Sequence, residues 1–452
     1  MTSISAPAER TDLGSVTPTE GTFGVGLLGR GTIGAAFEVL LARSAPRIEL
    51  LTGRTPSLAG VLTRSSGGGS FQEILERSEL IVELIGGIEP AREYVLRAMH
   101  AGRHVVTANK QLLSQHGEEL REAARSHGVQ LRFEGAVAGV VPVIRVLQES
   151  LAGARIERVH GIVNGTTNFI LTEMARAGVS FSEALAQAQR LGYAEADPSE
   201  DVDGRDAAAK MAILARLAFG TAVHIDQVRY EGIEQIQPDD LEYARELGLG
   251  LKLIGTAERI GDGLSVRVHP AFLYPGHPLA SIDGSFNAVT VESEEITEIT
   301  MSGPGAGGPQ TASAVLGDVI SAMIPPASAP PPSTVLEIVQ DVVSAFYLHL
   351  EVADQPGVLA QVAQVLALQD VSVKSVVQKG LGDQARLVMV VHPVLESRFE
   401  AAMALIAGLD VLRGPPRAIR VLEEGFGQGL GGPRAGSRRP AGGQSWLGSV
   451  LT

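Results

Sequence analysis

Cysteine is absent from this chain of 452 residues, and its absence excludes several kinds of chemistry. The protein has no disulfide bond, no thiolate nucleophile, and no zinc or iron–sulfur cluster held by cysteine. Aromatic residues make up only 4% of the sequence, which argues against a protein that stacks nucleic-acid bases. A net charge of -14 points the same way, because such a surface repels phosphate backbones. We therefore expect small molecules as partners, and no nucleic acid.

Long apolar runs are also missing. The first twenty residues carry several charged side chains and no apolar centre, so they do not resemble a secretory signal. The apolar run that follows is broken by Arg30, well short of the roughly 18 residues that a membrane span requires. We expect a soluble, cytoplasmic protein without a membrane partner.

Strand-like and helix-like segments alternate in the first third of the chain. FGVGLLG is a short apolar run, GRGTIG is a glycine-rich turn, and AAFEVLLAR is a helical stretch. We expect IELLTGR, SELIVELIG and HVVTAN to be further strands. Because strands that alternate with helices form parallel sheets, residues 22–148 are predicted to be a Rossmann-like nucleotide-binding domain of the α/β class.

The composition changes further along the chain. Residues 149–323 mix alanine-rich helical stretches with alternating strands, which predicts an α+β substrate and dimerisation domain with an open sheet. Proline-rich IPPASAPPPS indicates a linker, placed at 324–344. Residues 345–424 are typical of a small ferredoxin-like unit. We expect a flexible N-terminus at 1–21 and a disordered, glycine- and arginine-rich tail at 425–452.

The glycine-rich turn has the spacing G-x-G-x-x-G. Missing side chains there let the backbone approach a pyrophosphate at a helix N-terminus. A purely structural turn is the alternative, but the flanking strand and helix favour a dinucleotide site. The predicted cofactor contacts in this turn are Gly29, Gly31, Thr32, Ile33 and Gly34.

Two basic residues follow expected strands. LLTGRT offers no acidic residue for a ribose 2′-hydroxyl, but Arg54 suits a 2′-phosphate, which favours NADP while NAD stays open. Lys110 follows HVV at the carboxyl edge of the predicted sheet, where ligands of this fold bind. For both, an ordinary surface residue is the alternative.

The stretch GYAEADPSEDVDGRDAAAK, residues 192–210, holds six carboxylates and ends in Lys210. It does not fit a calcium loop, because Lys210 stands where a bidentate glutamate is required. Asp206 and Lys210 lie four apart on one helix face, and an exposed pair of this kind stabilises by only about 0.3–0.5 kcal/mol. The apolar MAILARLAF that follows predicts a buried helix instead. A lysine and an aspartate near the N-terminus of this helix suit recognition of an ammonium group and donation of a proton.

Three more segments are rich in small or polar residues. VNGTTNF suits either hydrogen bonds to a polar substrate or a helix cap, FEGAVAGVVP combines Glu134 with small residues whose carbonyls suit a monovalent cation, and SGPGAGG opens another helix. The ten histidines show no metal-binding spacing and are expected to be structural.

Together these motifs resemble the homoserine dehydrogenase family over about residues 23–323. GRGTIG, TANK, VNGTTN, the acidic stretch and GPGAGG occur in the family's order. The resemblance implies NAD(P)H-dependent reduction of L-aspartate 4-semialdehyde to L-homoserine, in threonine, methionine and isoleucine biosynthesis. A semialdehyde dehydrogenase that forms a thioacyl intermediate is excluded, because it needs a cysteine.

The resemblance also implies roles for particular residues. Lys210 is the implied proton donor and Lys110 its assistant, with Asp206 as a third catalytic residue that also binds substrate. Further substrate contacts are implied at Glu195, Asp201 and Thr167, and further cofactor contacts at Lys110, Gly192 and Gly303. A sodium ion is implied at Glu134, Val137, Gly139 and Val141, mostly through main-chain oxygens.

The C-terminal unit resembles an ACT domain, and DQPGVLAQVA matches its loop and first helix. Threonine is the implied effector, and a homodimer or higher homo-oligomer is implied by the family and the open sheet. Two alternatives stay open: an NADP-binding regulatory protein without catalysis, and a dehydrogenase for another small amino-acid aldehyde. The pairing of Asp206 with Lys210 argues against the regulatory protein, since a sensor needs no proton donor.

Overall fold

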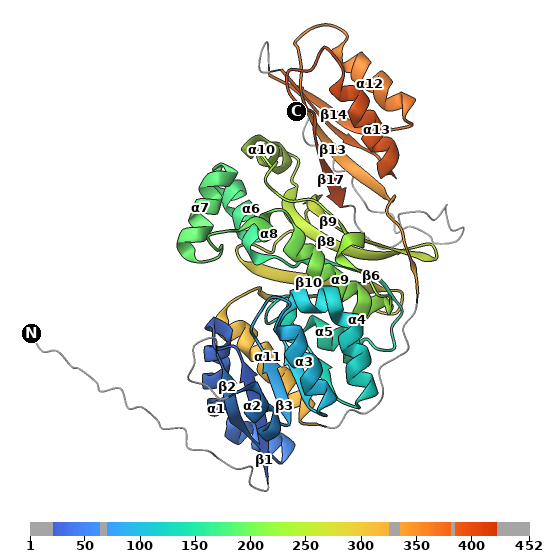
Figure 1. The fold of residues 1–452 in the computed structure, drawn as a ribbon. Coiled ribbons are helices and arrows are strands. Elements are labelled where there is room, and N and C mark those ends of the chain that lie inside the picture. Colours follow the sequence, from blue (N-terminus) through green and yellow to red (C-terminus); the bar gives the residue numbers. More distant parts are fainter. Residues whose placement is uncertain (1–20, 64–69, 325–334, 381–384, 423–452) are drawn as a thin grey trace, which may run out of the picture.

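The structure is a computed structural model that describes residues 21–63, 70–324, 335–380 and 385–422. Most of both predicted terminal segments and the proline-rich part of the linker lie outside these ranges. The described chain forms three parts in a row, a nucleotide-binding domain, a middle domain and a C-terminal domain (Figure 1). None of the helices in the described ranges is long and apolar enough to cross a membrane.

The first domain is a parallel five-stranded sheet with the order β2-β1-β3-β4-β5. Its strands are β1 (Thr22–Leu28), β2 (Thr55–Leu62), β3 (Leu80–Glu83), β4 (His104–Thr107) and β5 (Leu131–Arg132). Its helices are α1 (Thr32–Thr52), α2 (Phe71–Arg77), α3 (Ala91–His100), α4 (Lys110–Ser126) and, from much later in the chain, α11 (Gly308–Ala322). The strand order reverses between β1 and β3, which places a ligand crevice beside the glycine turn after β1.

One predicted strand is wrong. IELLTGR is the end of α1 and the turn after it, and the second strand begins only at Thr55. Phe37, Leu41 and Ile48 all face the core from α1, so the helical period continues through the segment. The helix ends where Gly53 adopts φ 74° and its N–H donates to Glu49.

The middle domain is built on a mixed sheet with the order β11-β10-β6-β8-β9. These strands are β6 (Ile156–Ile162), β8 (Gly250–Ile260), β9 (Gly263–Leu273), β10 (Phe286–Ser293) and β11 (Thr297–Pro304). The helices are α6 (Gly165–Ala177), α7 (Phe181–Leu191), α8 (Ser199–Val202), α9 (Arg205–Phe219) and α10 (Pro238–Glu246). Shorter elements are η1 (Glu134–Ala136), α5 (Val143–Arg145), η2 (Val146–Ser150), η3 (Ile225–Gln227), β7 (Arg229–Tyr230) and β12 (Glu337–Ile338).

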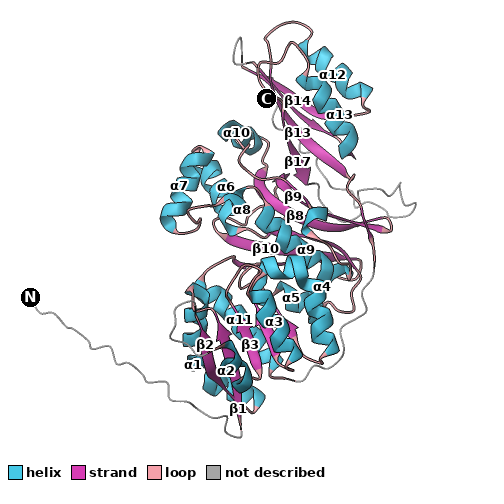
Figure 2. Cartoon of the chain, viewed as in Figure 1, coloured by secondary structure: helices cyan, strands magenta, loops and turns pink. Residues whose placement is uncertain are grey.

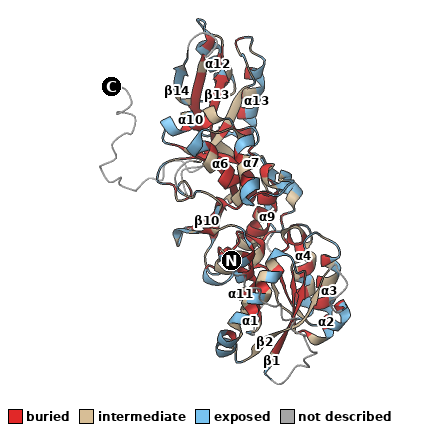
Figure 3. Cartoon of the chain, turned by 90° about the vertical axis from the view of Figure 1, so that its left-hand side faces the viewer, coloured by how far each residue is buried: buried red, intermediate tan, exposed pale blue. Residues whose placement is uncertain are grey.

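Helix α9 is the buried centre of the middle domain. It packs on β8 and β9, and Gly255 leaves the room that Met211 needs, since a Cβ at Gly255 would lie 2.7 Å from the methionine sulfur. Figure 3 shows most of α9 in the colour of buried residues. Because α4 packs against α9, the two sheets meet through this pair of helices (Figure 1).

The C-terminal domain has the ferredoxin-like order strand, helix, strand, strand, helix, strand, as predicted. Its main elements are β13 (Val343–Glu351), α12 (Val358–Leu368), β14 (Val373–Lys379), β15 (Arg386–Val391), the short β16 (Val394–Leu395), α13 (Glu396–Ala407) and β17 (Arg417–Leu422). The sheet continues that of the middle domain, because β17 pairs in parallel with β9 (Figure 2). The predicted three-part fold is confirmed. The sequence did not predict that the sheets of the middle and C-terminal domains would be continuous.

Candidate active site

A buried carboxylate lies between two lysines where the first two domains meet. Asp206, in the first turn of α9, is only 1% exposed. Its Oδ2 accepts from Lys210 Nζ at 2.7 Å, and its Oδ1 accepts from Lys110 Nζ. Lys110 is the first residue of α4 and Lys210 lies one turn further along α9, so the cluster joins both domains.

Asn164 fixes this cluster from the end of β6. Its Nδ2 donates to Asp206 Oδ2 at 2.8 Å and to Asp201 Oδ1 at 2.6 Å. Its Oδ1 accepts from the backbone N–H of Thr167, which makes Asn164 the N-cap of α6. The carbonyl of Val163 accepts from Lys210 Nζ at 2.8 Å, so two of that lysine's three N–H donors are used.

Charge decides the protonation of the buried groups. Burial alone would raise the pKa of Asp206, but the positive charges of Lys210 and Lys110 lower it well below its ordinary value. Burial would lower the pKa of Lys110, but the charge of Asp206 raises it. The pKa of Asp201 is raised, by burial and by the charge of Asp206. At neutral pH the centre is therefore an ionised carboxylate with a protonated Lys110.

The glycine turn lies at the carboxyl end of β1. Gly29 has φ 97°, and a Cβ there would lie 2.5 Å from the carbonyl oxygen of Leu84. A Cβ at Gly34 would lie 2.2 Å from the carbonyl oxygen of Gly29, whereas a Cβ at Gly31 would have no neighbour within 4 Å. The outer two glycines are thus required by packing, and Gly31 leaves the N-terminus of α1 open to a pyrophosphate.

The glycines of SGPGAGG, the late glycine turn at residues 302–308, have two different sets of neighbours. Gly308, the first residue of α11, packs against Thr32, since a Cβ there would lie 3.0 Å from the threonine methyl group. Gly303 instead lies beside Val140 and Val141. The N-termini of α1 and α11 therefore meet at the glycine turn, while Gly303 supports the loop after Glu134.

The structure spreads the other predicted substrate residues around the cluster. Asp201 contacts Asn164, and Glu195 is exposed in the loop after α7. Gly192 ends α7 with φ 78° and is also exposed. Thr167 is fully buried, and its hydroxyl donates to Asn164 Oδ1 at 2.9 Å. This placement argues against the predicted contact of Thr167 with substrate and makes it a support of Asn164.

Arg54 lies at the wrong end of the sheet for the cofactor. It precedes β2, and its guanidinium donates to Glu79 at 2.7 and 2.8 Å and to the carbonyl of Thr22 at 2.5 Å. Thr22 begins β1, and the glycine turn follows the end of that strand, about 20 Å away at 3.3 Å per residue. The predicted contact with a 2′-phosphate is contradicted, because the segment assigned to a second strand is the end of a helix.

The segment after Glu134 forms a tight loop against the late glycine turn. Ala138 and Gly139 have φ 57° and 64°, and a Cβ at Gly139 would lie 2.4 Å from the carbonyl of Gly305. Glu134 is buried, and its carboxylate accepts from the backbone N–H groups of Ile144 and Arg145 at 2.9 and 2.8 Å. Burial raises the pKa of Glu134 to about 7.

Asp318 is a second buried carboxylate beside this loop. It accepts from the backbone N–H of Glu134 at 2.7 Å, and burial raises its pKa to about 6. Arg145 contacts Asp318 at 3.4 Å, and Arg132 is near enough for its charge to lower the pKa of the same carboxyl. A monovalent cation among the loop's carbonyl oxygens would add positive charge beside Glu134, whose pKa is raised. The described residues hold no cluster of three or more His, Cys, Asp or Glu side chains suited to a metal, so such an ion would rely on the main chain.

Fold and site define an oxidoreductase that binds a nicotinamide dinucleotide. Three family models match the chain: "Homoserine dehydrogenase, NAD binding domain" at residues 29–134, "Homoserine dehydrogenase" at 142–320 and "ACT domain" at 346–410. Homoserine dehydrogenase of Corynebacterium glutamicum is 44% identical over 342 residues, which cover 73% of this chain and 77% of that protein. That of Neisseria gonorrhoeae is 40% identical over 346 residues, with coverage of 73% and 80%.

Solved structures agree. A homoserine dehydrogenase from Thiobacillus denitrificans superimposes with a TM-score of 0.85 at 38% identity, covering 89% of this chain and 98% of that one. A hyperthermophilic archaeal homoserine dehydrogenase in complex with NADPH gives a TM-score of 0.58 at 26% identity, with coverage of 67% and 97%. The chain belongs to the homoserine dehydrogenase family and is an oxidoreductase acting on the CH–OH group of homoserine. The predicted family and reaction are confirmed, which decides against the sensor without catalysis.

Replacing Gly34 and Gly31 by alanine separates packing from cofactor binding. Gly34→Ala forces a backbone clash, and overpacking of this kind costs about 1–3 kcal/mol, so we expect a lower Tm. Gly31→Ala meets no neighbour, so its Tm stays at the wild-type value while its Kd for NADPH, measured by fluorescence titration, rises. Wild-type affinity in Gly31→Ala would place the pyrophosphate elsewhere.

Replacing Asp206 by asparagine leaves two lysines facing each other without a carboxylate. Losing one partner of a buried ion pair costs about 3–5 kcal/mol, so we expect a marked fall in Tm near pH 7. The pKa of Asp206 is lowered by folding, so its stabilisation is present above its ordinary pKa of about 3.9 and is lost as pH falls below that value.

The difference in Tm between wild type and Asp206→Asn should therefore stay constant from pH 8 to 6 and narrow below about pH 4. Asp203→Asn, three positions earlier in the same acidic stretch, is the matched control and should show no such difference. A difference in Tm between wild type and Asp206→Asn that does not change with pH would contradict the charge-based account of Asp206.

Proposed function

We propose that Lys210 donates the proton in the reduction of L-aspartate 4-semialdehyde to L-homoserine. The observation that supports this role is the geometry of Lys210, whose side chain is 14% exposed and whose amine keeps one N–H donor free after its hydrogen bonds to Asp206 and Val163. A reduced nicotinamide, when bound along the first sheet, would supply the hydride to the aldehyde carbon. Lys210 then gives a proton to the developing alkoxide and regains one from solvent.

Lys110 and Asp206 prepare this proton transfer. Lys110 adds a positive charge at the carboxyl edge of the sheet, where negative charge develops on the substrate oxygen. Asp206 accepts a hydrogen bond from each amine and so holds both in place, and its charge raises the pKa of Lys110. Asp201, half-buried nearby and hydrogen-bonded to Asn164, adds negative charge near Lys210, and the exposed Glu195 is the proposed partner of the substrate ammonium.

NADP stays the proposed cofactor, now on a different basis. Arg54 no longer supports it, and the support is the likeness to the archaeal enzyme solved with NADPH. The carboxyl end of β2 at Leu62 is where an adenosine ribose would lie in this fold.

Sodium is proposed as a structural ion in the loop of Glu134, Val137, Gly139 and Val141. The support is the pair of buried carboxylates Glu134 and Asp318, the raised pKa of Glu134, and the positive φ of Ala138 and Gly139. The ion would lower the pKa of Glu134 towards its ordinary value and fix the loop that Gly303 packs against.

The C-terminal domain and the sheet edge support two further proposals. We propose that threonine binds the ACT domain, near the segment DQPGVLAQVA that begins at Asp354, and regulates an enzyme of threonine, methionine and isoleucine biosynthesis. We also propose a homodimer. Its support is β11, the end strand of the middle sheet, whose residues Thr297–Thr300 are exposed, with Ile299 among them.

Replacing Lys210 by methionine keeps the length of the side chain and removes the proton. We expect kcat for semialdehyde reduction to fall by about 10²- to 10⁴-fold, the usual contribution of a general acid, with little change in the Kd for NADPH. Lys374→Met, on the exposed face of β14, is the control and should keep wild-type kcat. Normal turnover in folded Lys210→Met would remove this residue from the mechanism.

Sodium should change how stability depends on pH. Glu134 has a raised pKa, so the folded state holds a proton that the unfolded state releases, and stability falls as pH rises from about 4.5 through 7. Replacing potassium chloride by sodium chloride should raise Tm at pH 8 more than at pH 5.

Glu134→Gln should weaken this sodium response. Glu149→Gln, an exposed glutamate in η2, is the matched control and should keep it. Equal responses to sodium and potassium in the wild type would argue against the ion.

A further inference from the structure

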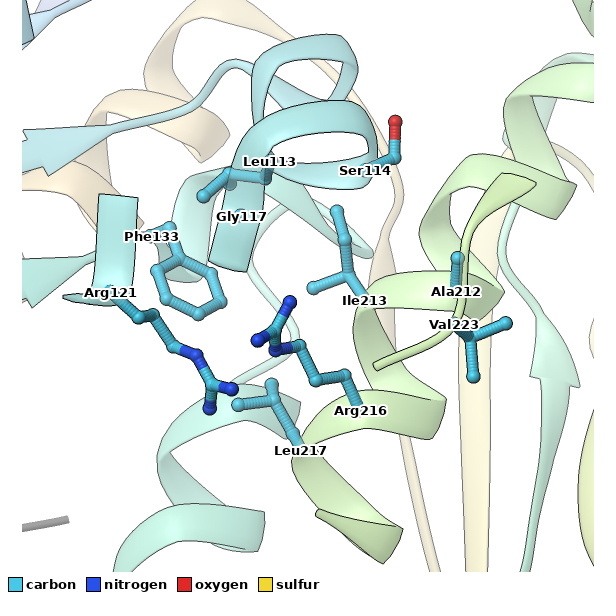
Figure 4. A pocket seen from close by; sticks show the side chains of 10 residues that line it. All are labelled: Leu113, Ser114, Gly117, Arg121, Phe133, Ala212, Ile213, Arg216, Leu217 and Val223. Atoms are coloured by element: carbon cyan, nitrogen blue, oxygen red, sulfur yellow. The ribbon is translucent and has the colours of Figure 1, made fainter. Parts of the chain in front are cut away.

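A small cavity lies between α4 and α9, away from the lysine cluster. Its volume is about 20 Å³, and Figure 4 shows Arg121 from α4 and Arg216 from α9 beside it. Most of the remaining lining is apolar and includes Phe133, Ile213 and Leu217. Two guanidinium groups therefore approach each other in a mainly apolar setting.

The positive charge at this cavity is only partly neutralised. Glu118, on α4, is the acid that contacts both groups: it lies 3.3 Å from Arg121 Nη2 and also pairs with Arg216. Glu118 is 59% exposed, so solvent weakens its field. Among the residues that the structure describes, no hydrogen-bond acceptor meets the buried Nε of Arg121 or that of Arg216.

Burial makes this arrangement costly. Desolvation lowers the pKa of Arg121 and lowers that of Arg216 to about 10. Both side chains are partly buried, with exposed fractions of 32% for Arg121 and 13% for Arg216, and they share one exposed acid while repelling each other. A second anion, placed in the cavity between Arg121 and Arg216, would offset both costs.

We propose that the cavity between Arg121 and Arg216 binds one halide-sized anion of the chloride type. Size sets the ligand class, because a single water needs about 10–15 Å³ and this cavity offers little more, too little for phosphate or an organic carboxylate. The guanidinium of Arg216 lies close to α4, since a Cβ at Gly117 would be in van der Waals contact with its Nη1 at 3.6 Å.

The site matters because of the two helices that it joins. Helix α4 begins with Lys110, and α9 carries Asp206 and Lys210. An anion that holds the two helices together therefore stabilises the junction that also contains the proposed catalytic cluster. Any effect of the anion on catalysis rests on the proposed function, whereas its binding does not.

Thermal unfolding of the full chain at constant sodium tests the proposal. Replacing sodium gluconate by sodium chloride should raise Tm by about 2 °C and then saturate, as ligand binding to the folded state does. Arg121→Gln should remove this rise.

Arg125→Gln should keep the rise in Tm. Arg125 lies on the same helix and pairs with a glutamate three positions earlier, as Arg121 does, but it is exposed. An equal rise in Arg121→Gln, or no rise in the wild type, would overturn the proposal. An equal rise with inorganic phosphate would contradict the single-atom ligand.

Crystals grown in sodium bromide give a direct second test. An anomalous peak between the guanidinium groups of Arg121 and Arg216 is expected, and featureless density or a water there would overturn the site. Neither experiment measures turnover, so a failed anion site leaves the role of Lys210 standing, and an active Lys210→Met enzyme leaves the anion site standing.

Discussion

The buried carboxylate of Asp206 is the constraint on which the rest of the site depends. A charge this far from water is tolerated only with close partners, and both of its cationic partners are lysines. One belongs to the helix after β4 and the other to α9, so the two sheets must meet in one way for the charge to be balanced. The same contact that lowers the free energy of the aspartate thus brings the proposed proton donor to the carboxyl edge of the nucleotide-binding sheet.

Buried polar clusters join the other parts of the chain in a similar way. Asp240 of α10 contacts His349 of β13 at 2.9 Å and Arg417 of β17 at 3.4 Å, between the middle and C-terminal domains. The parallel pair of β9 and β17 continues the sheet across the same boundary. The two domains thus share a sheet and a buried ionic cluster, and these contacts are the structural route that the proposed regulation would use.

The sequence predicts local features well and long-range contacts poorly. Glycine spacing, the apolar face of α9 and the order of strands in the C-terminal domain are local patterns, and all three fold as predicted. IELLTGR failed because a short apolar run fits a buried strand and a helix equally, and the assignment of Arg54 failed with it. Asn164 was missed as a central residue because its importance depends on contact with Asp206, 42 positions away. The VNGTTN motif contains Asn164 and was the available signal, but the sequence alone leaves open whether its amides bind a polar substrate or cap a helix.

A crystal structure of the full chain with NADP and homoserine would test the central claim most directly. The account predicts that the hydroxyl of homoserine lies within about 3.2 Å of Lys210 Nζ, on the donor not used by Asp206 or Val163. A hydroxyl bound instead by another side chain, with Lys210 still turned towards Asp206 and Val163 alone, would contradict it.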